Sequence, residues 1–236
     1  MHSILDGNNF KTAAREYFWL LNRAYPEKRS RLLVADRYHL DRHQRTALYR
    51  GIFPHDSNTL RIAKAAKFPP AKGLSMAIDL LNILHLISNY LYGRNVFHST
   101  DLFLRDDGEN FSRLDNHRFM LDALHLLGRT LASFEPSEVQ ICIKTSQISR
   151  YPEFLKNPSL LRDNLRTGSA DVHIISSAHI HRQLIESRAD IIATSDSVVL
   201  DSCAGSPLDL GGCILSVSFN ARLPDLHGLI YEKDPS

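Results

Sequence analysis

The spacing of apolar positions changes near residue 74, and that change divides the chain into two parts. Before it, apolar residues recur at helical spacing. After it, short apolar runs alternate with helical segments. The expected strands are residues 74–78, 95–98, 138–144, 171–175, 190–194 and 213–217. The expected helices are residues 81–91, 117–133, 152–167, 178–187 and 197–204. Strands that alternate with helices are typical of an α/β domain with a central parallel sheet covered on both faces.

The first part of the chain predicts three short helices joined by tight turns. The first begins at Asn8 or Asn9, either of which can cap it, and the second begins at Pro26. Asp41 is the expected cap of the third. These helices form a small all-helical module.

A connector follows the helices. Residues 53–72 contain prolines and mixed polar residues, which is typical of a linker with at most one helical turn. We therefore predict a basic helical module and connector at residues 1–68 and an α/β domain at residues 69–236.

The helical module is basic although the whole chain has a formal charge of only +2. Its cations are Lys28, Arg29, Arg31, Arg37, Arg42, Arg45 and Arg50, followed by Arg61, Lys64 and Lys67. Lysine and arginine neutralise phosphates, so one interpretation is a surface that binds nucleic acid. The alternative is that these residues are the solvated faces of short helices, paired with nearby acids.

Several classes of protein are disfavoured. The three cysteines form no Cys-x-x-Cys pair and suit neither a disulfide framework nor a structural zinc site. The first ten residues lack the apolar core of a secretory signal, and the apolar stretch 78–91 is interrupted by polar residues and too short to span a membrane. Dinucleotide-binding and P-loop glycine motifs are absent. We expect a cytoplasmic protein that has no membrane partner.

The candidate chemistry lies where expected strands end. One ends at Asp79, and another is followed by Asp196, so both acids belong to the strand edge where open α/β sheets bind ligands. The candidate residues are Asp79, Asn82, Asp101, Asp106, Asp107, Asp196 and Asp201. Carboxylates without a neutralising cation favour a hard divalent metal, and hydroxyls or amides of Thr194, Ser195 and Ser197 could contact a phosphate.

Simpler interpretations exist for several of these residues. Asp196 could only cap the following helix, Asp106 and Asp107 could lie in a solvated turn, and Asp201 could be a surface residue. His179 and His181 are two positions apart on an expected helix, so they point in different directions and are poor partners for one metal.

These residues resemble a known family. Asp79 with Asn82, and the run 194–197 with Asp201, resemble the site of a PIN-like nuclease domain. The whole chain resembles an uncharacterised prokaryotic family in which a small helical module precedes a PIN-like domain. The residues that carry this are Tyr25-Pro26, Asp36-Arg37-Tyr38, Leu48-Tyr49-Arg50-Gly51, Leu104-Arg105-Asp106 and Thr194-Ser195-Asp196-Ser197.

The resemblance implies a three-layer PIN-like fold and a ribonuclease dependent on Mg²⁺ or Mn²⁺, which cleaves RNA with a metal-activated water. The implied metal ligands and catalytic residues are Asp79, Asp106, Asp196 and Asp201. The implied substrate-binding residues are Asn82, Lys144, Thr194, Ser195 and Ser197.

Two departures from the family pattern leave other functions open. Leu80 and Leu81 separate Asp79 from Asn82 where a glycine and an aromatic residue are expected, and Lys144 stands at a strand end where an acid is expected. Lys144 could weaken metal binding or neutralise a phosphate. The alternatives are a catalytically degenerate module that binds nucleic acid or protein, and a scaffold that forms a homodimer through its helical module.

Overall fold

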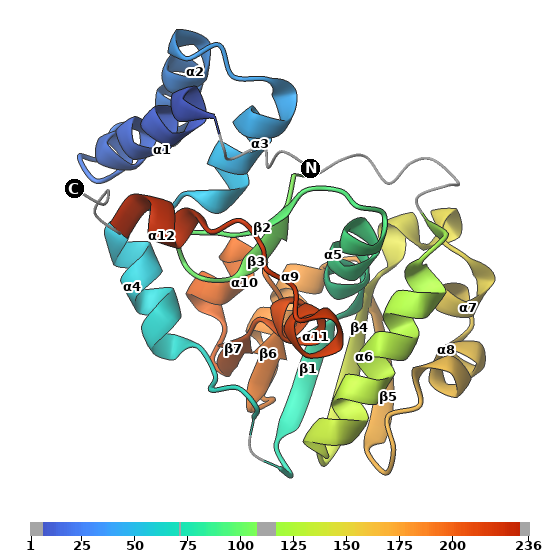
Figure 1. Ribbon diagram of the computed structural model, residues 1–236. Helices are drawn as coiled ribbons and strands as arrows, with labels where there is room; N and C mark the ends of the chain where they lie inside the picture. The colour runs from blue at the N-terminus through green and yellow to red at the C-terminus, as the bar shows by residue number, and fades with distance from the viewer. Residues whose placement is uncertain (1–6, 71, 108–116, 232–236) are drawn as a thin grey trace. The chain divides into compact units, whose positions relative to one another are not determined.

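The computed structural model describes residues 7–70, 72–107 and 117–231 (Figure 1). The chain forms two compact units. Among the described residues, 7–63, 93–107 and 222–231 form the helical unit, and 64–70, 72–92 and 117–221 form the sheet unit. The sequence predicted a single boundary near residue 68, whereas the chain passes from one unit to the other four times.

The sheet unit contains the predicted parallel sheet, which is confirmed. Its strands are β1 (Ser75–Asp79), β4 (Glu138–Lys144), β5 (Asp171–Ser177), β6 (Ile191–Ala193) and β7 (Ser206–Leu208). They lie in the order β5-β4-β1-β6-β7, and every neighbouring pair is parallel. From β1 the chain adds β4 and β5 on one side and then β6 and β7 on the other. The direction of winding therefore reverses between β1 and β6, which is where open α/β sheets place their ligands.

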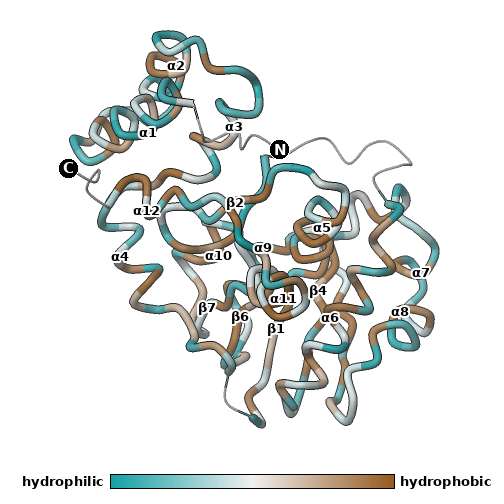
Figure 2. Tube along the Cα trace, in the orientation of Figure 1, coloured by the Kyte–Doolittle hydropathy of each residue, from teal (hydrophilic) through white to brown (hydrophobic). Residues whose placement is uncertain are grey.

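Helices cover both faces of the sheet, as the alternating pattern predicted. They are α5 (Leu80–Leu91), α6 (Met120–Phe134), α7 (Glu153–Lys156), α8 (Pro158–Leu165), α9 (Ile180–Ile185), α10 (Ser197–Ser202) and α11 (Leu210–Phe219), with a 3₁₀ helix at Thr145–Arg150. Ala77, Cys142 and Ile192 turn toward α9 and α10 and pack with Leu184 and Val199. Figure 1 shows α5, α6 and α11 together on the other face of the sheet. Side chains alternate between the two faces along a strand, so the neighbouring positions belong to that face. Figure 2 shows how hydrophobic α5 is, in keeping with its buried position.

The helical unit confirms the predicted N-terminal helical region and adds segments from later in the chain. Its elements are α1 (Asn8–Leu21), α2 (Glu27–Arg37), α3 (Arg42–Gly51), α4 (His55–Lys64), the antiparallel strands β2 (Val96–His98) and β3 (Leu104–Asp106), and α12 (Leu226–Tyr231). Phe97 and Leu226 are buried in the same core as Phe10 and Tyr17. Gly51 permits this contact, because a Cβ there would lie 2.4 Å from Leu226 Cδ1.

Several predicted elements were wrong. Residues 213–217 belong to α11 rather than to a strand, because Asp209 starts a helix by accepting a hydrogen bond from the Gly212 N–H. The short β7 was missed. The predicted helix at 152–167 is two helices, divided where Asn157 caps α8. The connector holds α4, and Gly7 rather than Asn8 or Asn9 is the N-cap of α1.

Asp41 was predicted correctly as the cap of α3. It forms a capping box in which its carboxylate accepts from the Gln44 N–H while the Gln44 side chain accepts from the Asp41 N–H. Among the helices described, none combines the length and apolar character that a membrane crossing needs.

Substitution of Gly128 tests the packing of α6 on α8. A Cβ at this position would lie 1.4 Å from the Leu165 carbonyl oxygen, so the two backbones must separate to admit a methyl group. We expect Gly128→Ala to lower the free energy of unfolding by about 2–3 kcal/mol in urea denaturation. Gly7→Ala is the control, because its nearest atom would be 3.9 Å away and the loss of glycine from the N-cap of α1 should cost at most about 1 kcal/mol. Equal stability of the two variants would contradict this packing.

Candidate functional site

Asp79 is the central residue of the candidate site. It is the last residue of β1 and the N-cap of α5, where its Oδ1 accepts a hydrogen bond from the Asn82 N–H at 3.4 Å. Its Oδ2 accepts from the Thr194 hydroxyl at 3.3 Å. Only 9% of the residue is exposed. The carboxylate is therefore held between the end of its own strand and the end of the neighbouring one.

The segment after β6 completes this arrangement. The Thr194 hydroxyl accepts a hydrogen bond from the Asp196 N–H at 3.2 Å. Asn82 Oδ1 accepts from both the N–H and the hydroxyl of Ser195, at 3.0 and 3.1 Å. These contacts join the start of α5 to the segment between β6 and α10. The structure thus brings Asp79, Asn82, Thr194, Ser195 and Asp196 together at the point where the sheet reverses its winding.

The pKa of the buried Asp79 carboxyl differs from that of an aspartate on the surface. Burial, with a further contribution from the charge of Asp196, raises the pKa of Asp79 to about 6, although the hydrogen bonds from Asn82 and Thr194 act in the opposite direction. The charge of His181 also lowers it. Burial and the charge of Asp79 together raise the pKa of Cys142, its neighbour on β4, to about 12. The carboxylates of Asp79 and Asp196 therefore repel each other, as expected where a cation could bind.

Asp196 has two roles in the structure. Its Oδ1 caps α10 by accepting from the Val198 N–H at 2.9 Å, so the simple capping interpretation holds. Its Oδ2 lies 3.3 Å from His181 Nε2. The spacing of His181 from His179 gave no sign of this contact. The partner of His181 is Asp196, the N-cap of α10, which lies fifteen positions later in the sequence.

Sequence reasoning also missed Asp209, which directly follows β7 and caps α11. Asp79, Asp196 and Asp209 therefore follow the ends of three adjacent parallel strands. An Asp three residues before a glycine and ahead of an apolar helix was the signal that could have identified it.

The other predicted residues of the sheet unit have different surroundings. Asp201 is exposed near the C-terminal end of α10. Ser197 is the first residue of α10 and half-buried. Lys144 ends β4, two residues beyond Cys142. Lys144 makes no ion pair with any residue that the structure describes.

The acids of the predicted acidic loop belong to the helical unit. Asp106 ends β3, and its carboxylate pairs with Arg50 at 3.2 Å. Asp101 is fully buried between Arg61 and Arg105, and Asp107 lies 2.8 Å from His43 Nδ1. Each of the three acids thus has a cationic or imidazole partner in its own unit. The rest of that loop, residues 108–116, lies outside the described residues.

The donors at the strand edge are hard oxygen atoms. Carboxylates, an amide oxygen and a hydroxyl suit Mg²⁺ or Mn²⁺ better than a soft metal. Within residues 7–70, 72–107 and 117–231, however, no group of three or more His, Cys, Asp or Glu side chains is arranged to hold a metal ion. A cation here would use one or two carboxylates and take its remaining ligands from water or a substrate phosphate, as Mg²⁺ commonly does.

Comparison with known proteins finds two family models that match successive parts of this chain. Residues 9–64 match a family described as "Protein of unknown function (DUF434)", and residues 70–213 match one described as "Domain of unknown function (DUF5616)". An uncharacterized protein of Methanocaldococcus jannaschii is 22% identical over 194 residues, which cover 82% of this chain and 90% of that protein. No solved structure shows a significant match. The expected likeness to an uncharacterised family is confirmed, and these matches carry no information on a PIN-like nuclease.

Proposed function

We propose that this chain, which belongs to the DUF5616 family, is a divalent-metal-dependent ribonuclease with a PIN-like sheet domain. The observation that carries the proposal is the pair Asp79 and Asp196, which a Thr194 hydroxyl links at the winding reversal of a parallel sheet. A buried carboxylate with a raised pKa beside a second acid is typical of a functional site.

Each residue has a proposed role. Asp79 and Asp196 would hold Mg²⁺ or Mn²⁺, and Asn82 would keep the two strand ends together through Ser195. When bound, such a cation activates water and stabilises charge on a phosphodiester. Thr194 orients the Asp79 carboxylate by donating its hydroxyl proton to Oδ2. Because the pKa of Asp79 is about 6, this carboxylate is mostly ionised only above that pH, and cation binding should strengthen there.

The substrate-binding role falls to groups at the same edge. Lys144 lies at the end of the strand next to β1 and could neutralise a phosphate. The hydroxyl of Ser197, at the start of α10, could donate to a phosphate oxygen. The roles of Asp106 and Asp201 as metal ligands remain predictions from the family resemblance.

A second candidate function is a catalytically degenerate module that binds nucleic acid or protein. The observation that favours it is that His181 already contacts an oxygen of Asp196 at 3.3 Å, and that no three His, Cys, Asp or Glu side chains among the described residues are arranged to hold a metal ion. Lys144 would then weaken the binding of a cation rather than assist catalysis. This alternative expects binding that is indifferent to a chelator.

Calorimetric titration with Mn²⁺ distinguishes the two functions. We expect wild-type protein to bind the ion, with affinity rising as the pH increases through about 6, and Asp79→Asn to lose measurable binding. Asp163→Asn, which changes an exposed aspartate of α8, is the matched control and should bind as wild type. RNA binding without Mn²⁺ binding, unchanged by EDTA, would support the degenerate module instead.

A further inference from the structure

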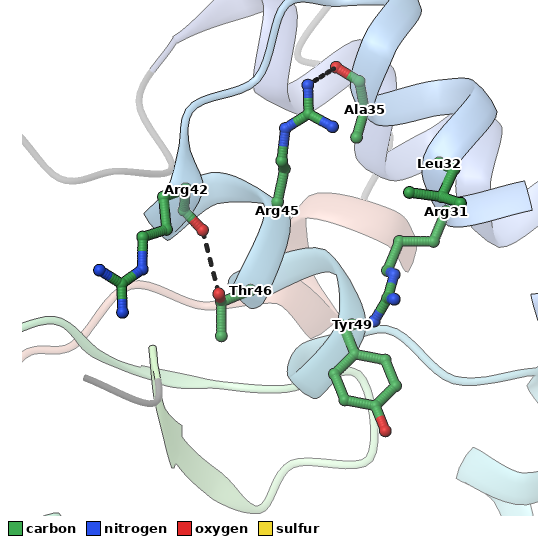
Figure 3. Close-up of a pocket in the computed structure, with 7 residues that line it drawn as sticks. All are labelled: Arg31, Leu32, Ala35, Arg42, Arg45, Thr46 and Tyr49. Atoms are coloured by element: carbon green, nitrogen blue, oxygen red, sulfur yellow. Dashed lines mark hydrogen bonds between the residues drawn. The ribbon is translucent and has the colours of Figure 1, made fainter. Parts of the chain in front are cut away.

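We propose that the groove between α2 and α3 binds single-stranded nucleic acid, with phosphate contacts from two arginines and one base stacked on Tyr49. The groove is a cavity of about 380 Å³ (Figure 3). The residues of interest in its lining are Arg31, Leu32, Arg42, Arg45, Thr46 and Tyr49. It lies wholly within the helical unit, and the proposal does not depend on the metal site.

Helical geometry places the polar side chains of the groove together. Positions 42, 45, 46 and 49 share one face of α3, because residues three and four apart are neighbours on a helix. Arg31 and Leu32 come from α2, which packs beside it. In Figure 3 the Arg42 side chain lies on one side of Thr46, and Tyr49 with Arg31 lies on the other.

Arg45 has a structural role in this groove. It donates from Nε to the Leu40 carbonyl oxygen at 2.7 Å, and from its terminal nitrogens to the Ala35 carbonyl oxygen and to Asp36, at 3.3 and 2.7 Å. These bonds fix α3 against the end of α2. The charge of Arg45 is balanced by Asp36, so the net positive charge of the groove comes from other residues.

Arg31 and Arg42 supply that charge. Arg42 is exposed, and neither guanidinium makes an ion pair with a described residue. Arg31 instead lies over the ring of Tyr49, with its Cζ 4.5 Å from the ring centroid. Two guanidinium groups facing a groove complement a phosphodiester chain, because each can donate two parallel hydrogen bonds to phosphate oxygens.

Tyr49 distinguishes a nucleic acid from other anions. The residue is 49% exposed, so much of its ring remains open to solvent although Arg31 lies over it. An exposed aromatic ring beside arginines is the combination with which proteins bind single strands, since every base has a face that can stack. A free phosphate or an acidic peptide would use the arginines but would gain nothing from the ring.

Fluorescence anisotropy with a short labelled single-stranded RNA tests the proposal. The full-length protein is used in EDTA, so that cleavage cannot interfere and the result is independent of the proposed nuclease. Tyr49→Leu should weaken binding by at least about five-fold, the smallest effect expected from losing one stacked base. It should leave binding of heparin, a polyanion without bases, unchanged.

The arginines are tested by salt dependence. Arg31→Ala and Arg42→Ala should each reduce the slope of log affinity against log salt by about 0.7, the value for one phosphate contact with a single strand. The control is Arg29→Ala, which removes an exposed arginine of α2 outside the groove and should leave the slope unchanged. Thermal melting verifies that each variant is folded.

Three results would overturn the proposal. Wild-type protein that fails to bind the RNA would exclude nucleic acid and point to an acidic protein segment. An Arg29→Ala slope as low as that of Arg42→Ala would mean diffuse attraction rather than a site. Equal loss of heparin and RNA binding in Tyr49→Leu would exclude base stacking.

Discussion

Asp79→Asn is expected to abolish RNA cleavage while making the metal-free protein more stable at neutral pH. The loss should be about a hundred-fold or more, because metal stabilisation of transition-state charge contributes several kcal/mol. The gain in stability follows from the burial of Asp79, which makes its ionised carboxylate unfavourable in the folded state. An asparagine oxygen can still accept the hydrogen bond that Asp79 receives from the Asn82 N–H.

The sign of the pH effect follows from the raised pKa of Asp79. Its folded value of about 6 lies above the ordinary value of 3.8. The favourable contribution of the neutral carboxyl is fully present below about pH 4 and is lost as the pH rises through about 6. Urea denaturation in EDTA should therefore show Asp79→Asn on the order of 2–3 kcal/mol more stable than wild type above pH 7, and similar to it near pH 4.

A divalent cation should make wild type the more stable of the two proteins. Mn²⁺ binds only the folded wild-type protein under the proposal, so it should raise the melting temperature of wild type and leave that of Asp79→Asn unchanged. Asp196→Asn should also lose cleavage, and Asp163→Asn should retain it. Cleavage at the wild-type rate by both Asp79→Asn and Asp196→Asn would remove the basis of the proposed function.

Asp101→Asn is expected to destabilise the helical unit by about 3–5 kcal/mol, since it leaves buried guanidinium groups without their counter-ion. Arg105 donates to both carboxylate oxygens of Asp101, at 2.5 and 2.9 Å, and Arg61 donates at 2.8 Å. Both arginines are 4% exposed, and each lies over the ring of Phe53. Neither guanidinium could recover its hydration in the folded variant.

The pKa of Asp101 gives this prediction a pH dependence. Burial alone would raise it, but the charge of Arg105 and the hydrogen bonds from Arg105, Ser99 and Arg61 lower it to about 2. The stabilisation that the ionised Asp101 carboxylate provides is therefore present above about pH 4 and lost as the pH falls toward 2. Denaturation of wild type and variant should converge over that range.

Two further variants test the explanation. Asp56→Asn, an exposed aspartate of α4, should change stability by less than about 1 kcal/mol. Combining Asp101→Asn with Arg61→Met should restore part of the lost stability by removing one of the uncompensated cations. An Asp101→Asn protein as stable as wild type would show that the ion cluster is not needed for folding.

The features that the sequence predicted well depend on local patterns. The strand at residues 138–144 was predicted with the bounds that the structure gives it, because Val139, Ile141 and Ile143 are flanked by clear helical segments. The proximity of Asp79 and Asp196 followed from a general property of parallel sheets, since both follow strand ends at one edge. Asp41 was recognised as a cap because aspartate directly before a helical pattern is a local signal for a helix start.

The features that sequence reasoning missed depend on contacts between distant segments. The apolar run at residues 213–217 suits a buried strand or a buried helix equally well, and only its packing decides. His181 meets Asp196 across two helices. Asp101 was predicted as a site residue because its arginine partners, Arg61 and Arg105, could not be assigned to it from spacing alone.

The discontinuous helical unit has a consequence for how the protein is made. Phe97 and Leu226 complete a core whose other buried members lie between Phe10 and Ile52. During synthesis the first helices therefore cannot finish packing until residue 226 has been added to the chain. Until then the apolar side chains that Phe97 and Leu226 cover in the folded protein stay accessible to water and to other chains.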